Sequence, residues 1–167
     1  MTRLYLSLFL LVLGANAAEY GLVKKNSESY RLFLKEFEEH TQKHKKLEPT
    51  SGSDGDHIHR AVAYMLMGDT TNSRREYKLI EPESITTLPF PIKQYLLDVQ
   101  LDIGAYDELL RSVTVGECLQ TKTLKQRKAC RYYLGVARFL KDEQKDKNFA
   151  YASYYFPALK KLNGENK

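Results

Sequence analysis

The sequence predicts an all-α protein built from stacked antiparallel helical hairpins. Apolar residues recur at the three- and four-residue spacing of helices from His57 to Leu162. The alternation of apolar and polar residues that marks a half-buried strand is missing there, apart from an ambiguous patch at Val113–Val115. A chain of 167 residues, of which 43% are hydrophobic, is long enough to bury the core of one domain.

The first 17 residues have the three parts of a secretory signal peptide. Arg3 supplies a basic start, residues 4–13 form a short apolar run, and Ala15-Asn16-Ala17 is a small-residue cleavage site. Because about ten apolar residues are too few to span a bilayer, we expect cleavage after Ala17 and export, to the periplasm or the medium. The alternative is an N-terminal membrane anchor, but no stop-transfer run follows, so we expect no stable anchor after cleavage.

Residues 18–56 are expected to form an amphipathic helix and a flexible linker. The helix is predicted from Ser27 to Lys46, because one of its faces carries a run of apolar side chains at helical spacing. These are Tyr30, Phe33, Leu34 and Phe37. The stretch Pro49–Gly55 combines helix breakers with small polar residues and predicts the linker. Residues 57–167 then form the helical-hairpin domain.

Three points where one predicted helix stops and another begins lie at nearly equal intervals. They are centred on Gly68, Gly104 and Lys141, which are 36 and 37 residues apart. Glycine just past a helix end adopts the left-handed conformation of a C-terminal cap at little cost. The helices expected before these points are Ile58–Met67, Ile92–Ile103 and Arg127–Leu140. The pattern therefore predicts three hairpins in series, each stabilised by stacking on its neighbours.

The residues of the first two hairpins resemble those of the tetratricopeptide repeat family. The matching positions are Ala61, Tyr64, Gly68, Ser73 and Tyr77 in the first hairpin, and Gly104 and Tyr106 in the second. This resemblance implies a scaffold that presents a concave face to a peptide or a protein. An irregular helical bundle remains the alternative architecture.

Cys118 and Cys130 are the two cysteines of the chain, and they are expected to form a disulfide. In an exported protein, an even number of cysteines separated by a short stretch is typical of a structural bridge. A redox site would instead favour the Cys-x-x-Cys spacing.

Charge and motifs exclude several functions. Without residues 1–17 the chain loses Arg3 and keeps 25 basic and 21 acidic residues, a net charge of +4 that is too dispersed for nucleic-acid binding. The sequence contains neither G-x-S-x-G nor H-E-x-x-H, and we therefore expect no enzymatic activity and no cofactor. The four histidines, His40, His44, His57 and His59, are expected to be solvated and to hold no metal.

Aromatic and basic residues are concentrated in the last third of the chain, and they supply the candidate partner-binding residues. Tyrosine and arginine are enriched where proteins bind one another. The candidates are Tyr132, Arg138, Tyr151, Tyr155 and Phe156. The alternative is that most of these rings belong to the core, because several have the spacing of a single helix face.

These observations together favour an exported interaction module that binds another protein. One expected task is that of a scaffold or accessory factor for an envelope machine such as a pilus or a secretion system. The alternative is a periplasmic immunity or inhibitor protein, whose basic charge would suit the acidic cleft of a toxin or a cell-wall hydrolase.

Overall fold

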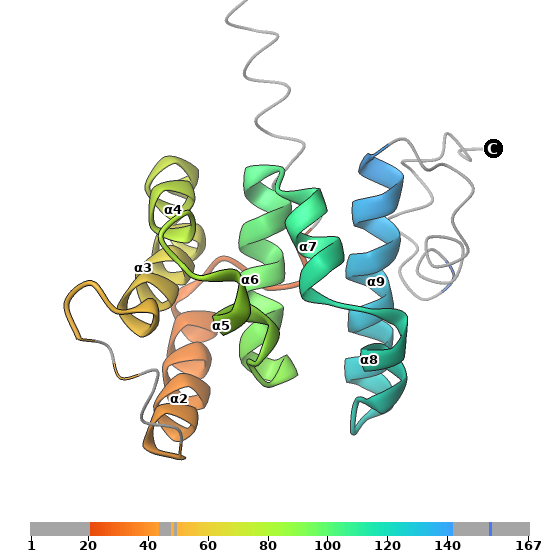
Figure 1. Ribbon diagram of the computed structural model, residues 1–167, viewed down its shortest axis with the longest axis horizontal. Coiled ribbons are helices and arrows are strands. Elements are labelled where there is room, and N and C mark those ends of the chain that lie inside the picture. The colour runs from red at the N-terminus through yellow and green to blue at the C-terminus, as the bar shows by residue number, and fades with distance from the viewer. Residues whose placement is uncertain (1–20, 44–47, 49, 142–153, 155–167) are drawn as a thin grey trace, which may run out of the picture.

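The computed structural model describes residues 21–43, 48, 50–141 and 154. Within these residues the chain forms eight helices and no strand, which confirms the all-α prediction (Figure 1). The predicted signal peptide lies outside them. The helices are α2 (Ser27–Lys43), α3 (Asp54–Leu66), α4 (Thr70–Tyr77), α5 (Pro82–Thr86), α6 (Phe90–Ile103), α7 (Tyr106–Ser112), α8 (Val115–Gln120) and α9 (Leu124–Leu140).

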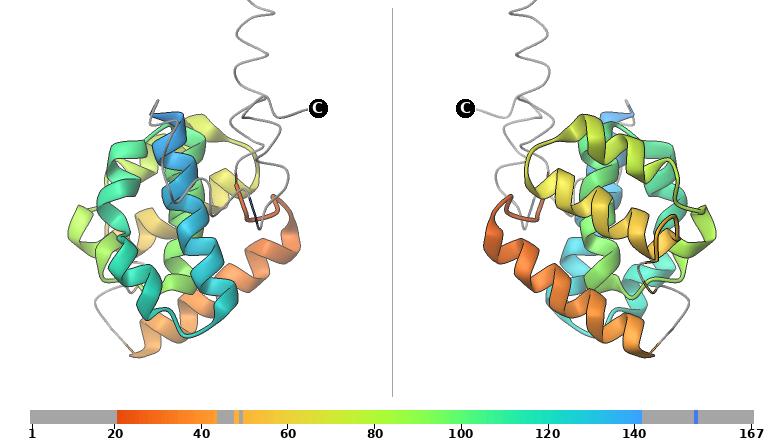
Figure 2. Two further views of the ribbon diagram at one scale, coloured as in Figure 1. Left: turned by 90° about the vertical axis from the view of Figure 1, so that its right-hand side faces the viewer. Right: turned by 90° about the vertical axis from the view of Figure 1, so that its left-hand side faces the viewer.

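Helix α6 lies at the centre of the fold and is buried on both sides. Leu97 and Leu101 belong to a core cluster shared with α7, α8 and α9. Ile92, Leu96 and Val99 belong to a second cluster, shared with α2, α3 and α4. Because its apolar residues face two directions, α6 separates two packed halves (Figure 1). Figure 2 shows α2 lying alongside α3 at the outer side of one half.

Two of the three predicted turns lie in the described part of the chain with the geometry expected of them. Gly68 and Gly104 have φ angles of 80° and 75°, in the left-handed region that glycine adopts without steric cost. They join α3 to α4 and α6 to α7 as two helical hairpins. The third turn begins at Lys141, and the chain that would complete its hairpin lies outside the described residues. A regular repeat architecture of the tetratricopeptide kind therefore stays a prediction.

Helices α3 and α9 begin earlier than the sequence predicted, because a side chain caps each new start. Helix α3 begins at Asp54, inside the predicted linker, and the Ser53 hydroxyl accepts a hydrogen bond from the Asp56 amide at 3.2 Å. Helix α9 begins at Leu124, where Thr123 accepts from the Gln126 amide at 3.1 Å. The ambiguous patch is extended at Val113, and Thr114 then caps α8.

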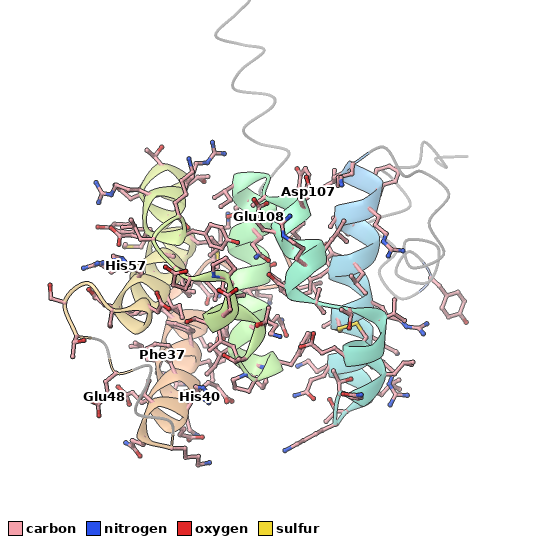
Figure 3. All side chains as sticks on the ribbon, in the orientation of Figure 1. Phe37, His40, Glu48, His57, Asp107 and Glu108 are labelled. Atoms are coloured by element: carbon pink, nitrogen blue, oxygen red, sulfur yellow. A yellow bond between two sulfur atoms is a disulfide. The ribbon has the colours of Figure 1, made fainter. Side chains whose placement is uncertain are left out.

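The predicted disulfide between Cys118 and Cys130 is present. It links α8 to α9, and both residues are fully buried in the second half of the molecule (Figure 3). In the part of the chain that the structure describes, no helix has the length and apolar character needed to cross a membrane.

Candidate binding groove

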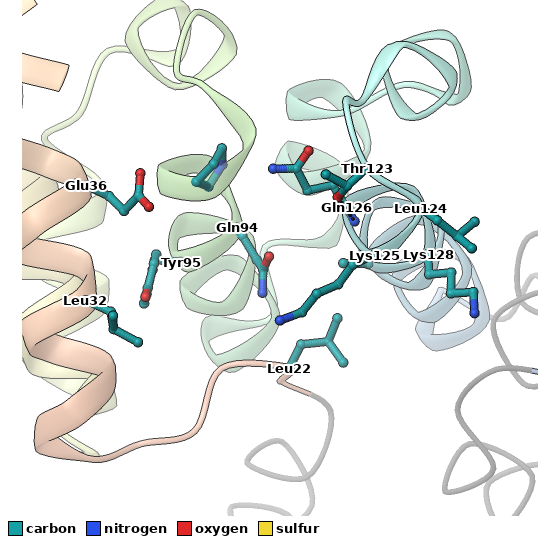
Figure 4. Close-up of a pocket in the computed structure, with 12 residues that line it drawn as sticks. Leu22, Leu32, Glu36, Gln94, Tyr95, Thr123, Leu124, Lys125, Gln126 and Lys128 are labelled. Carbon is teal, nitrogen blue, oxygen red and sulfur yellow. Dashed lines mark hydrogen bonds between the residues drawn. The ribbon is translucent and has the colours of Figure 1, made fainter. Parts of the chain in front are cut away.

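A groove of about 830 Å³ lies between α2 and α9, with α6 as its floor (Figure 4). Its volume is in the range of ligand pockets. The α2 wall, the α6 floor, the α9 wall and the chain before α2 all contribute side chains. The lining residues are Leu22, Leu32, Glu36, Pro91, Gln94, Tyr95, Thr123, Leu124, Lys125, Gln126, Lys128 and Ala129.

The α2 wall is positioned by aromatic packing beneath it. Phe33 and Phe37 are buried, and the Phe33 ring lies 5.1 Å from that of Tyr95 on α6, measured between ring centroids. Because residues four apart share a helix face, this packing fixes the two groove residues beside them, Leu32 and Glu36. The Leu32 side chain stays 45% exposed.

The α9 wall carries basic and apolar side chains on a helix that the disulfide holds. Cys130 and Ala129 are buried, whereas Leu124 is 60% exposed at the groove. Lys125 and Lys128 lie on the same wall, and the sequence has no acidic residue from 121 to 141. This wall is therefore positively charged, while the opposite wall carries Glu36.

An extended segment, residues 21–26, crosses α6 and closes the groove at Leu22; we call it the strap. The buried Asp98 carboxylate accepts hydrogen bonds from the backbone amides of Leu22 at 3.0 Å and Val23 at 2.7 Å. One turn further along α6, Asp102 accepts a hydrogen bond from Lys25 Nζ at 2.5 Å. A side chain on residue 21 would place its Cβ 3.2 Å from Asp98 Oδ1, so Gly21 permits the close approach.

Burial dominates the electrostatics under the strap. It raises the pKa of Asp98 to about 7, although the two strap amides lower it in part and the nearby Asp102 charge raises it further. Burial and the Asp98 charge also raise the pKa of Tyr133, whose hydroxyl approaches Asp98 without reaching ordinary hydrogen-bond geometry. Burial likewise raises the pKa of Tyr95 on the groove floor, and the Glu36 and Asp98 charges add to it.

Of the predicted partner-binding residues, Tyr132 and Arg138 lie in the described part of the chain, and neither lines this groove. Tyr132 is 4% exposed and packs edge to face on Tyr133, with ring centroids 5.6 Å apart, so it is part of the core. Arg138 is half-buried toward the end of α9. Tyr151, Tyr155 and Phe156 lie outside the described residues.

The histidines near the start of α3 make structural contacts. His57 Nδ1 lies 2.9 Å from Glu76 Oε2, which also accepts a hydrogen bond from Arg60 Nε at 3.0 Å (Figure 3). Burial by itself would raise the pKa of Glu76, but these hydrogen bonds outweigh it and lower that pKa. His59 Nε2 lies 3.2 Å from the Tyr30 hydroxyl. Among the described residues, no three metal-binding side chains gather into a site.

The groove residues were missed by sequence reasoning, although the sequence holds a weak sign of them. Leu32 falls outside the buried face of its helix, and Leu124 directly follows the capping residue Thr123, at a helix start where an apolar side chain has little to cover it. Comparison with known protein families, curated proteins and solved structures finds no match to this chain.

Proposed function

We propose that this protein is an exported, non-enzymatic interaction module that binds a partner protein through the groove between α2 and α9. The observation that carries the proposal is the pair Leu32 and Leu124. These two leucines are 45% and 60% exposed and lie on opposite walls of one concave site. Exposed apolar side chains that line a groove gain free energy when a partner removes them from water.

Export is supported by two independent features. The first is the signal peptide that the sequence predicts. The second is the Cys118–Cys130 disulfide, because such bonds persist in oxidising compartments such as the periplasm.

A binding role is supported by the chemistry of the lining. Its side chains are mainly aliphatic, amide and lysine groups, and among the described lining residues the carboxylate of Glu36 stands without a paired acid or a histidine. Thr123 has a structural task, because its hydroxyl caps α9. Such a surface suits the recognition of a polypeptide better than proton transfer between paired groups.

Two tasks fit a module of this kind. A scaffold or accessory factor of an envelope machine, such as a pilus or a secretion system, would use the groove to hold one component. An immunity or inhibitor protein would present the basic α9 wall to the acidic cleft of a toxin or a cell-wall hydrolase.

The test is an affinity capture with matched variants. The full chain is expressed in its own source, and the exported protein is used to capture partners from an envelope extract at low and high salt. We expect a stoichiometric partner whose capture falls about tenfold with Leu124→Ser, because loss of a buried leucine costs about 1.5–3 kcal/mol.

Leu79→Ser is the matched control, because Leu79 is 54% exposed and lies outside the groove. If the unaltered protein, Leu124→Ser and Leu79→Ser captured equal amounts of the partner, the partner would bind another surface. Absence of any partner at both salt concentrations would contradict the proposed function itself. The identity of a captured partner separates the accessory role from the inhibitor role.

A further inference from the structure

We propose that the turn between α8 and α9 is a second interaction surface, which binds reversibly to an anionic lipid bilayer. We call residues 119–127 the tip. This inference goes beyond the proposed function, because Leu119 and Lys122 do not line the groove. It is carried by exposed leucines, by positive charge that no acidic residue neutralises and by a backbone that is held in place.

The tip lies at the lower end of α8 and α9 in Figure 1, at the edge of the molecule. Leu119, in the last turn of α8, is 52% exposed, and Leu124, at the start of α9, is 60% exposed. The Leu124 side chain points away from α2 and α6 (Figure 4). Arg127 shares this face of α9, because it lies three residues further on, and its guanidinium donates to the Leu119 carbonyl at 3.4 Å. The two leucines therefore flank one basic side chain.

The positive charge of the tip has no acidic residue beside it in the sequence. Lys122 is exposed, and among the described residues neither Lys122 nor Arg127 forms an ion pair with a carboxylate. No Asp or Glu occurs from 118 to 141. The acid that precedes this stretch, Glu117, pairs with the buried Lys93 at 2.6 Å. The tip therefore complements an anionic surface, to which each exposed basic residue adds attraction.

The backbone of the tip is satisfied and held by the tip itself. The end of α8 leaves the carbonyls of Cys118 and Leu119 without a donor from its own helix. The Thr121 hydroxyl donates to the first of them at 2.8 Å, and Arg127 donates to the second. The disulfide to Cys130 fixes the base of the turn. Because these backbone groups are already paired, the tip loses little when it leaves water for the headgroup region.

The combination of side chains favours a bilayer over other surfaces. Exposed leucines beside basic groups suit the boundary between acyl chains and headgroups, because the leucines bury apolar area while the charges stay among the phosphates. Lys78 and Leu79 provide a comparison elsewhere on the molecule, since both are exposed. The exposed Glu81 and Glu83 follow them closely, and an anionic surface would repel these carboxylates. Exposure is therefore common to both places, but only the tip joins it to unopposed positive charge.

The test is co-sedimentation of the exported protein with two kinds of vesicle, an equal mixture of phosphatidylglycerol and phosphatidylcholine, and phosphatidylcholine alone. We expect binding to the mixed vesicles, about tenfold weaker binding to the neutral ones, and loss of the difference at high salt. Lys122→Glu and Leu119→Ser should each weaken binding to the mixed vesicles about tenfold, because the first reverses a charge at the surface and the second removes buried apolar area.

Two control variants make the same chemical changes outside the tip. Lys78→Glu and Leu79→Ser alter an exposed lysine and an exposed leucine, and both should leave vesicle binding unchanged. All four variants should keep the melting temperature of the unaltered protein, because the altered side chains are exposed. No binding to mixed vesicles, equal binding to neutral ones at low salt, or full binding by the two tip variants would each overturn the proposal.

The vesicle and capture experiments fail in different ways. Leu119→Ser and Lys122→Glu leave the groove unaltered, so they should capture the partner as well as the unaltered protein does. If they lose the partner and the unaltered protein binds no vesicles, the tip binds a protein and the lipid proposal is wrong. If vesicles bind through the tip but no partner is captured, the lipid surface stands and the proposed function is wrong.

Discussion

The two halves of the molecule on either side of α6 are held by different means. The first half, α2 to α4, packs through apolar and aromatic side chains such as Phe33, Ile58 and Met65. The second half, α7 to α9, also has an apolar core, but it adds a disulfide and an ion pair to α6, where the buried Lys93 Nζ donates to Glu117 at 2.6 Å. Since the groove has one wall in each half, its α2 wall depends on packing and its α9 wall is also held covalently. The aromatic packing under α2 therefore positions one wall of the groove.

Removal of an aromatic ring under α2 should cause the largest loss of stability among these predictions. Phe33 is fully buried against Phe37 and Tyr95. Phe33→Ala should lower the free energy of unfolding by about 3–5 kcal/mol, because it removes the buried ring and leaves a cavity. Urea denaturation followed by circular dichroism measures the loss.

Leu32→Ala is the control for this prediction, since Leu32 is the neighbouring residue and is exposed at the groove. It should change stability by less than about 0.5 kcal/mol. If the two variants lost the same stability, the α2 wall would not depend on the buried rings.

Removal of the disulfide tests how much the covalent bond stabilises the second half. A cross-link between residues 12 apart should contribute about 3 kcal/mol by limiting the unfolded chain. Cys118→Ala/Cys130→Ala should therefore lower the melting temperature by about 6–12 °C, and calorimetry measures the change. Thiol titration of the unaltered exported protein should find no free cysteine. If free thiols were found, or if the double variant had the same melting temperature as the unaltered protein, the disulfide would not stabilise the second half.

Sequence reasoning could predict the parts of the fold that depend on local pattern. The apolar face of α2, the glycine turns at Gly68 and Gly104, and the cysteine pair each follow from neighbouring residues. Two helix starts were missed although their signal is local, since Ser53 and Thr123 each accept a hydrogen bond from an amide only three residues further on.

Contacts between distant segments could not be predicted in this way. Asp98 looks like an ordinary helix carboxylate until the strap, about 75 residues earlier, covers it. Lys93 is buried because α5, α7 and α8 bring it the carbonyls of Thr86 and Ser112 and the Glu117 carboxylate. The groove has the same origin, since its two walls are nearly a hundred residues apart in the sequence.

Titration of Asp98 should make stability depend on pH in an unusual direction. Its folded pKa of about 7 lies above the unfolded value of 3.8, so between these values the folded state holds a proton that the unfolded state has lost. The resulting stability is greatest below about pH 4 and is lost as the pH rises to 7. The slope is about 1.4 kcal/mol per pH unit.

The experiment compares unfolding free energies at pH 5 and pH 6. The groups that face Asp98 are Tyr133, Asp102 and the Lys25 that pairs with Asp102. Asp98→Asn should remove about 1.4 kcal/mol of the difference in unfolding free energy between pH 5 and pH 6. Asp107→Asn is the control, because Lys141 lowers the pKa of that carboxyl, which is fully ionised at both pH values. Parallel pH curves for the unaltered protein and Asp98→Asn would contradict the prediction.

The smallest effect concerns the strap, in which Leu22 packs against the core of the second half and Val23 against that of the first. Lys25→Met removes the ion pair with Asp102, whose side chain is 4% exposed, and should weaken the strap by about 1 kcal/mol. Amide exchange at Leu22 and Val23 should then accelerate about fivefold. Lys24→Met, at the exposed neighbouring lysine, should leave both amides protected. If exchange instead rose equally through α3 and α9, the strap would be part of the global fold. Acceleration confined to the strap would mean that the end of the groove at Leu22 can open while both walls stay in place.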